Sequence, residues 1–344
     1  MRGRSSSSAF QEIQRPAAAL TVGSNGWLFG TTTYGGGNDW GTVYAIKPPA
    51  SAGGEWSSEL PSTTGAAIGY PYGSVAIGKN GVLYATSWEG GSTFNLEGDV
   101  FSVAPPTSPG GAWVTNAISD ISNCCGQYPE SGVVIGAGGV LYGASENSVY
   151  SVTSPVTAGG SWTTAMLHSF CGPGDGCGPA NSELAIGAGG VLYGATGQGG
   201  TGSVTSCGRG GTDFGCGTVY SLTPPASPGG SWTETVLYSF NGGSDGAKPS
   251  GVVIGPKGVL YGTTPNGGTG SCNCGTIFAL TPPASPGGAW TKTVVYEFSG
   301  LADGGSPMSS VLVGRNGALY GTTSAGGASA ACAGGCGTVF ALMP

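Results

Sequence analysis

The stretch Gly258-Val259-Leu260-Tyr261-Gly262-Thr263-Thr264 occurs six times in the chain with small changes. The other copies begin at Gly26, Gly81, Gly139, Gly190 and Gly317, and consecutive copies lie 51 to 68 residues apart. Repeats of roughly 20–50 residues or slightly more are typical of solenoids, propellers and arrays, in which each repeat is one supersecondary unit. This stretch therefore predicts the architecture of nearly the whole chain.

Each repeat has the pattern of four short strands. An apolar run such as 250–254 precedes a Gly-x-x-Gly turn, the Leu-Tyr-Gly-Thr strand and a Gly-rich loop of variable length. A third strand such as 217–222 then leads through a Pro-Pro-Ala-Ser-Pro-Gly-Gly link to a fourth strand such as 231–240. Valine, isoleucine, tyrosine and phenylalanine favour these strands, and Pro-Pro and Gly-Gly favour a turn. Since no window has a 3.6-residue apolar period, we expect almost no helix.

Six such repeats predict an all-β fold, a six-bladed β-propeller of four-stranded antiparallel blades. We expect one domain, residues 1–344, with repeats at about 17–70, 71–128, 129–178, 179–248, 249–306 and 307–344. The last repeat ends after its third strand, and residues 5–16 precede the first. We therefore expect this N-terminal strand to pair into the last blade, which closes the ring and covers strand edges. A β-solenoid is the alternative.

The composition excludes several classes of partner. Only 8% of the residues are charged and 39% are hydrophobic, which is too apolar for a disordered chain. The net charge of −7, with ten scattered Lys and Arg residues, argues against nucleic acid and anionic membranes. No apolar run approaches 18 residues, so we expect no membrane insertion. Residues 1–8 lack the apolar region of a signal peptide, so we do not expect them to be one. We expect a monomer.

Ten cysteines lie in or beside the loops, in close local pairs. An even number in such pairs indicates disulfides and an exported protein, although zinc is an alternative for closely spaced thiolates. For Cys124 and Cys125, a bridge from one of them to Cys171 or Cys177 competes with a bond between the two neighbours. The expected pairs are Cys124/Cys125, Cys171/Cys177, Cys207/Cys216, Cys272/Cys274 and Cys332/Cys336.

Four motifs together resemble a known family: Leu-Tyr-Gly-Thr-Thr, Gly-Gly, Gly-Thr-Val-Phe/Tyr, and Phe-x-Gly-x-x-Asp-Gly-x-x-Pro at 240–249. The chain resembles, over nearly its whole length, the GloVer-type (Gloeo/Verruco) tandem-repeat family of exported bacterial proteins. The resemblance implies a secreted or cell-surface location. It implies no reaction, so it supplies no catalytic residue.

The variable loops and the cysteines should share one face of the blades, and binding residues tend to lie on such loops. Trp40, Tyr72 and Trp88 depart from the repeat consensus, so the blades do not require them. Aromatic rings stack on sugars while carboxylates bond hydroxyls, which predicts a site for a glycan or a surface protein. Alternatively, the rings cover loop glycines and pack locally. The candidate residues are Tyr34, Asp39, Trp40, Tyr70, Tyr72, Trp88, Glu89 and Tyr128.

A second candidate site lies where the innermost strands begin. Glu130, Asn181 and Glu183 should approach the mouth of a central channel. Two carboxylates and an amide suit Ca²⁺, or the two carboxylates act as an acid/base pair. This constellation predicts a hydrolase or lyase as the alternative to a binding protein, so the sequence leaves open whether the chain is an enzyme. If these residues are only solvated loop side chains, we expect no cofactor.

Other chemical groups have plainer interpretations. Asp175, Asp245 and Asp303 each precede a glycine, a pattern of turns more than of ion ligands. His168, the single histidine, stands where other repeats have tyrosine, which favours a structural role. One tryptophan recurs near the fourth strand of most repeats, as expected for packing between blades: Trp56, Trp113, Trp162, Trp232 and Trp290.

Overall fold

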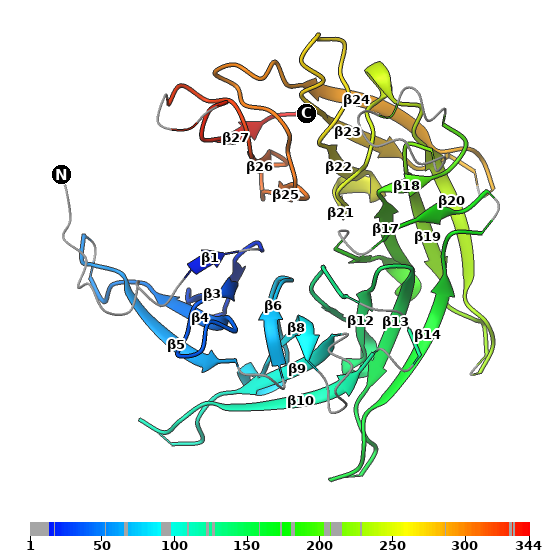
Figure 1. The fold of residues 1–344 in the computed structure, drawn as a ribbon. Coiled ribbons are helices and arrows are strands. Elements are labelled where there is room, and N and C mark those ends of the chain that lie inside the picture. The colour runs from blue at the N-terminus through cyan, green and yellow to red at the C-terminus, as the bar shows by residue number, and fades with distance from the viewer. Residues whose placement is uncertain are drawn as a thin grey trace. The chain divides into compact units, whose positions relative to one another are not determined.

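The structure is a computed structural model, and it is built almost entirely of β-strands (Figure 1). Its helical segments in the described part are 3-10 turns: η1 (Lys79–Gly81), η2 (Ala137–Gly139), η3 (Ala188–Gly190), η5 (Gly243–Asp245) and η6 (Pro256–Gly258). None of the described helices is long and apolar enough to cross a membrane. The structure describes residues 14–344 apart from 17, 52, 65–67, 91–97, 109, 122–123, 126–127, 158, 173, 180–182, 203–206, 208–214, 228, 286, 330–331 and 333.

The chain forms two compact units, residues 1–166 and 167–344. The first sheet of the first unit contains β1 (Gln14–Pro16), β2 (Thr21–Val22), β3 (Leu28–Tyr34), β4 (Thr42–Lys47) and β5 (Ser57–Thr63). The second contains β6 (Ile68–Pro71), β7 (Ala76–Ile77), β8 (Leu83–Gly90), β9 (Asp99–Ala104) and β10 (Val114–Asp120). The third contains β11 (Val134–Ile135), β12 (Leu141–Ala144), β13 (Ser148–Thr153) and β14 (Thr163–Ser169), which runs into the second unit.

The second unit continues the pattern. Its first sheet contains β16 (Ala185–Ile186), β17 (Leu192–Thr196), β19 (Thr218–Thr223) and β20 (Thr233–Ser239). The next contains β21 (Val252–Ile254), β22 (Leu260–Thr264), β23 (Thr276–Thr281) and β24 (Thr291–Glu297). The last contains β25 (Leu312–Val313), β26 (Leu319–Thr323) and β27 (Thr338–Leu342). A separate ribbon pairs β15 (Gly176–Cys177) with β18 (Gln198–Gly199).

The predicted fold class is confirmed: the protein is an all-β six-bladed β-propeller of mostly four-stranded antiparallel sheets. The pairing of the N-terminal segment differs from the prediction in its last three residues. Gln14 pairs with Tyr34, and Pro16 with Thr32, in the first sheet. Proline donates no backbone N–H, which suits it to such an edge strand. The rest of the predicted closing segment, residues 5–13, lies outside the described residues.

The glycine of the Leu-Tyr-Gly-Thr motif makes room for an aromatic ring on the neighbouring strand. A Cβ atom at Gly262 would lie 2.5 Å from the Phe278 ring, which crosses from β23. The Phe278 side chain is fully buried, as is Tyr220 of the preceding repeat, which crosses Gly194 in the same way. The small residue is therefore a packing requirement, since a larger side chain would displace the core ring.

The two threonines of the motif connect strands and sheets. In repeat five, the Thr264 and Thr276 hydroxyls are 2.8 Å apart across β22 and β23. The Thr263 hydroxyl donates to the backbone oxygen of Ser309, just before the next sheet, at 2.8 Å. Repeat one makes the same two kinds of contact. These buried hydroxyls therefore have their hydrogen bonds satisfied while they join one sheet to the next.

Three of the recurring tryptophans pack as expected on the preceding sheet. Trp162 contacts Tyr84 with ring centroids 6.1 Å apart, and Trp290 contacts Tyr193 at 6.3 Å. Trp113 packs against the core cluster that contains Phe29. These contacts confirm the packing role of Trp113, Trp162 and Trp290.

Candidate functional site

Three predicted aromatic residues meet at the end of β3 in the first unit. Tyr34 is the last residue of β3, Trp40 lies just before β4, and Tyr70 belongs to β6. The ring centroids of Tyr34 and Tyr70 are 5.4 Å apart, and those of Trp40 and Tyr70 are 5.2 Å apart. All three side chains are half-buried. We call these three residues the first aromatic group.

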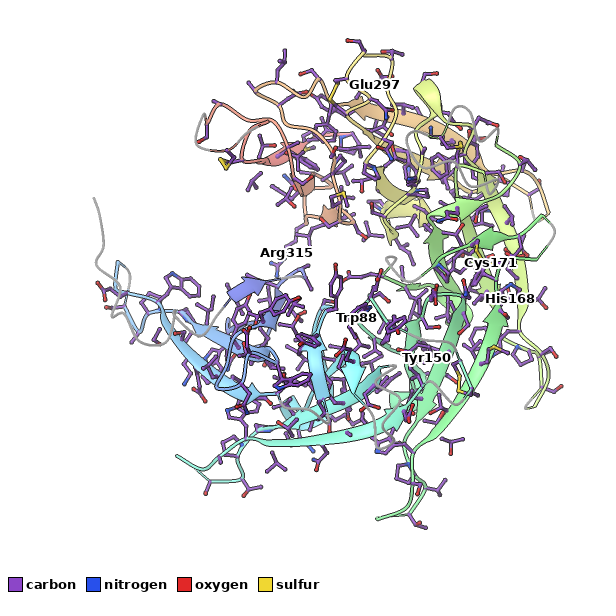
Figure 2. The ribbon with its side chains drawn as sticks, viewed as in Figure 1. Trp88, Tyr150, His168, Cys171, Glu297 and Arg315 are labelled. Atoms are coloured by element: carbon purple, nitrogen blue, oxygen red, sulfur yellow. A yellow bond between two sulfur atoms is a disulfide. The ribbon has the colours of Figure 1, made fainter. Side chains whose placement is uncertain are left out.

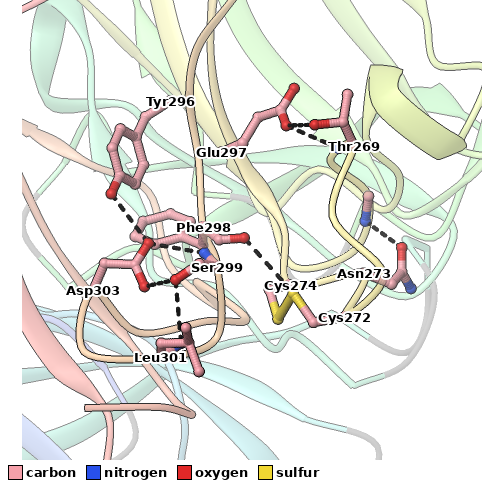
Figure 3. Close-up of a disulfide and its surroundings, with 11 residues drawn as sticks. Thr269, Cys272, Asn273, Cys274, Tyr296, Glu297, Phe298, Ser299, Leu301 and Asp303 are labelled. Atoms are coloured by element: carbon pink, nitrogen blue, oxygen red, sulfur yellow. Dashed lines mark hydrogen bonds between the residues drawn. A yellow bond between two sulfur atoms is a disulfide. The ribbon is translucent and has the colours of Figure 1, made fainter. Parts of the chain in front are cut away.

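Asp39 shapes the loop that carries Trp40. Its Oδ1 atom accepts a hydrogen bond from the Gly35 N–H at 2.8 Å, and its backbone has φ 60°. In repeat five, Asn273 accepts from the Gly267 N–H at 2.6 Å, with φ 53° (Figure 3). Since an amide oxygen forms the same contact, this loop geometry does not require the charge of Asp39.

Trp40 stands where repeats four, five and six have a cysteine directly before Gly-Thr. Its indole lies against the backbone of β6, because a Cβ atom added at Gly69 would be 2.8 Å from the ring. The Trp40 carbonyl also accepts a hydrogen bond from the Tyr70 N–H at 2.7 Å. Trp40 therefore covers a glycine, as the local-packing interpretation expects, while it also contacts Tyr70 within the first aromatic group.

A second aromatic group consists of Trp88, which is labelled in Figure 2, and Tyr128. Their ring centroids are 4.9 Å apart. Trp88 and Glu89 lie near the end of β8, where Glu89 pairs with Gly69 of β6. β6 thus carries Tyr70 of the first group beside β8, which carries Trp88 of the second. In the described part of the chain, the exposed Tyr72 makes no ring contact with either group.

Carboxylates lie close to the first aromatic group. Desolvation raises the pKa of Tyr70, and the negative charge of Glu89 raises it further, as do Tyr34 and Asp39. The two acids predicted to accompany the aromatic residues therefore lie within electrostatic reach of the Tyr70 hydroxyl. The structure thus brings Tyr34, Asp39, Trp40, Tyr70 and Glu89 together.

Tyr70 and Tyr128 have the backbone conformation of their repeat position. Their φ angles are 55° and 54°, and each directly precedes a proline. The same position before proline holds Gly178, Lys248 and Ser306 in repeats three, four and five, with φ 73°, 60° and 51°. A left-handed conformation costs a side-chain-bearing residue about 1–2 kcal/mol, and here the repeat itself imposes that cost. One tyrosine of each aromatic group therefore stands where glycine would be easier to accommodate.

The residues predicted at a channel mouth are divided between the two units. Glu130 follows Pro129 in the first unit and is half-buried. In the second unit, the backbone of Glu183 forms a parallel bridge with Gly251. Asn181 lies outside the described residues. The Ca²⁺ and acid/base interpretations stay predictions, and among the described residues no group of three or more His, Cys, Asp or Glu side chains is placed to hold a metal ion.

The Asp-Gly positions take part in turns. Asp245 accepts hydrogen bonds from the Tyr238 hydroxyl and the Asn241 N–H, both at 2.8 Å. Asp303 does the same in the next repeat (Figure 3). His168 takes the place of the tyrosine in its own repeat, with Nε2 3.1 Å from Asp175. These contacts support the turn and structural interpretations of the three aspartates and the histidine.

The cysteine pairs expected from their local spacing are disulfides. Cys124 bonds to its neighbour Cys125, so the alternative bridge to Cys171 or Cys177 is not formed. The disulfides also occupy the thiolates that a zinc site would need. The five bonds are Cys124–Cys125, Cys171–Cys177, Cys207–Cys216, Cys272–Cys274 and Cys332–Cys336.

Asp99 is a chemically distinctive residue that the sequence reasoning missed. It begins β9, is 1% exposed, and stands where Thr276 and its counterparts form their hydroxyl pairs. Its partner across the sheet is Ser87, and within the described residues neither Asp99 Oδ2 nor Ser87 Oγ has a hydrogen-bond partner. Burial and the nearby Asp120 raise the pKa of Asp99 to about 7. The replacement of threonine by aspartate in Gly-Thr-Val-Tyr was the sequence signal.

Solved structures resemble this chain in fold. A Thermus thermophilus protein, provisionally assigned as an oxidoreductase (glucose dehydrogenase), is 17% identical, with 95% of this chain and 96% of that chain covered and a TM-score of 0.52. At this identity the likeness concerns the fold alone. A gluconolactonase from Xanthomonas campestris is 13% identical, with 73% of this chain and 68% of that chain covered. Its TM-score is 0.42.

The sequence comparisons identify a repeat family and no relative of known activity. No curated protein matches the chain. The match to the repeat family covers β19, β20 and the last two sheets. The family model that matches residues 202–344 is that of the Gloeobacter/Verrucomicrobia repeat.

Proposed function

We propose that this protein is an exported binding module that engages a glycan through the two aromatic groups of its first unit. The observation that carries the proposal is the meeting of Trp40, Tyr70 and Tyr34 beside the carboxylates of Asp39 and Glu89. Rings and hydrogen-bonding groups in this combination are characteristic of ligand sites. Five disulfides support an oxidising, extracellular location.

A sugar fits this surface better than a flat protein interface. The rings stand tilted or edge-on to one another, with interplanar angles of 64° for Tyr34–Tyr70 and 45° for Trp40–Tyr70. Rings tilted in this way form a stepped surface, on which each ring contacts the C–H face of one pyranose unit. The acids beside them accept hydrogen bonds from sugar hydroxyls, and bonds to charged groups are the stronger ones.

The test is glycan-array binding followed by titration of the intact protein with the glycans that bind. We expect the Trp40→Ala/Trp88→Ala double variant to lose at least tenfold in affinity, because it removes one ring from each group. Asp39→Asn keeps the loop contact, since Asn273 forms it in repeat five, and therefore tests the contribution of the carboxylate to binding separately. Undiminished binding by the folded double variant would refute this site.

The strained backbone supplies a second test of the same site. Tyr70→Gly relieves about 1–2 kcal/mol of backbone strain and loses two ring contacts worth about 0.5–1.5 kcal/mol each. The two effects nearly cancel, so we expect stability to change by no more than about 1 kcal/mol while glycan affinity falls. A Tyr70→Gly variant that binds as well as the parent would show that the Tyr70 ring takes no part in binding.

The last sheet is proposed to gain its fourth strand from the N-terminal segment. In the described residues β27 is the edge of a three-stranded sheet, and Val339 and Met343 are 83% and 65% exposed. Such edges are commonly covered by another strand. Residues 5–13 are the segment that the repeat count leaves unassigned. Deletion of residues 1–13 should therefore lower the melting temperature, and an unchanged melting temperature would exclude this role.

A further inference from the structure

A pocket lies between the first two sheets, at the end of the strands opposite to the aromatic groups. Its volume is about 540 Å³, and its lining includes the turn at 23–25, Trp27, Lys47, Glu59 and Trp113. β3 runs from beside this pocket at Leu28 to Tyr34. Seven strand residues span about 20 Å, so this pocket and the first aromatic group are separate places in the same unit.

Three of the lining residues depart from the repeat. Other repeats have valine or alanine at the position of Trp27, and threonine, alanine or methionine at the position of Lys47. Where repeat one has Glu59, counted from the recurrent tryptophan, the others have asparagine, alanine or threonine. The other repeats form their sheets without these side chains, so the fold does not require them. All three nevertheless line one pocket.

The three residues contact one another and the neighbouring sheet. The Lys47 ammonium lies 4.2 Å from the centre of the Trp27 ring and forms an ion pair with Glu59. The Glu59 Oε1 atom also accepts a hydrogen bond from Trp113 Nε1 at 2.9 Å. The hydrogen bond from Lys47 lowers the pKa of Glu59, so this carboxyl is ionised at neutral pH. The Lys47 and Glu59 side chains are still 32% and 35% exposed, which leaves both open to a ligand.

This arrangement selects a ligand by charge and by shape. The ion pair is internally neutral, so neither an anion nor a cation finds an excess of opposite charge. An aromatic groove for proline-rich peptides would use the indole N–H as a donor to the peptide. Trp113 Nε1 already donates to Glu59, so it is not available for that bond. An ammonium with three donors and a carboxylate acceptor do suit vicinal hydroxyls, while indoles suit a C–H face.

We propose that the pocket formed by Trp27, Lys47, Glu59 and Trp113 binds a neutral pyranose unit of a glycan. The sugar ring contacts the indoles, and its hydroxyls bond to the exposed parts of Lys47 and Glu59. The volume falls within the range of about 300–1,000 Å³ that small-ligand sites occupy. This site is independent of the one proposed at the loops, because it shares no residue with it.

The test uses substitutions that copy the other repeats and therefore should fold. Trp27→Val, Lys47→Thr and Glu59→Thr each introduce a residue found at the same place in another repeat. Intact protein is titrated with neutral hexose oligosaccharides (cello-, malto- and mannohexaose) and with hexagalacturonate, and followed by tryptophan fluorescence and calorimetry. We expect at least one neutral oligosaccharide to bind, and the triple variant to weaken that binding at least tenfold.

The Trp40→Ala/Trp88→Ala variant separates this site from the loop site. Binding that survives in this variant but not in the triple variant supports the pocket, whether or not the loop site binds glycans. Binding lost only in Trp40→Ala/Trp88→Ala, or equal in the triple variant and the parent, overturns the proposal. Preference for hexagalacturonate, or no binding of any neutral oligosaccharide, overturns it as well.

Discussion

Asp99→Thr would restore in the second sheet the hydroxyl pair that the other repeats form. In the native protein, Asp99 is 1% exposed and faces Ser87, and burial together with Asp120 raises its pKa to about 7. Its ordinary pKa is 3.8. Each pKa unit corresponds to about 1.4 kcal/mol, so the buried carboxylate costs up to about 4 kcal/mol of folding free energy.

The sign of the pH dependence follows from where the proton is bound. Below about pH 4, Asp99 is protonated in both the folded and the unfolded protein, so the carboxylate adds no cost. Between about pH 4 and 7, only the folded protein keeps the proton, and the free energy of unfolding falls as the pH rises. Above about pH 7 the full cost is present. Asp99→Thr removes this dependence.

The assay is urea unfolding of the parent and of Asp99→Thr at pH 4 and pH 8. We expect similar stabilities at pH 4 and a variant that is more stable by up to about 4 kcal/mol at pH 8. Asp99→Asn removes the same charge and should show the same direction. Asp120→Asn should show a smaller gain, because Asp120 is the lesser cause of the raised pKa. A variant advantage that is equal at both pH values would refute the reasoning.

Three further predictions concern stability. Tyr220→Phe should stabilise the protein by about 1 kcal/mol in thermal unfolding, because the buried Tyr220 hydroxyl has no partner among the described residues and Phe278 fills the equivalent place; a loss would contradict this. Lys292→Ala should cost about 3–5 kcal/mol, because the Lys292 side chain is 4% exposed and its Nζ lies 2.6 Å from Asp245 Oδ1; a change below about 1 kcal/mol would contradict it. Dithiothreitol should lower the melting temperature, and intact mass measured with and without reduction should show all ten cysteines paired.

The loop site was predictable only in part. Trp40 and Trp88 were found because they depart from a consensus that the repeats themselves define. Asp99 departs from the same consensus but occupies a strand, where a search for binding residues on loops does not look. Whether a substituted residue is buried or exposed decides its chemistry, and burial depends on the neighbouring strands.

The pocket could not be located from the sequence at all. Trp27, Lys47 and Glu59 belong to three different strand ends, and Trp113 comes from the next repeat. The turns and links on this side have similar sequences in all repeats. We therefore expected function on the variable loops, at the opposite ends of the strands. Side chains far apart in sequence form a site only through sheet register and the packing of one sheet on the next.

The sequence by itself determined the number of repeats, their strands and turns, and the local cysteine pairs apart from the choice of partner for Cys124 and Cys125. These features depend on contacts within one repeat, or on backbone preferences of glycine and proline, which a short stretch of chain contains. Only the tertiary structure decided that Gln14–Pro16 joins the first sheet, that Asp99 is buried, and which side chains meet between sheets. Those outcomes depend on burial and on contacts between distant segments. The backbone preferences of a short stretch of chain do not determine either.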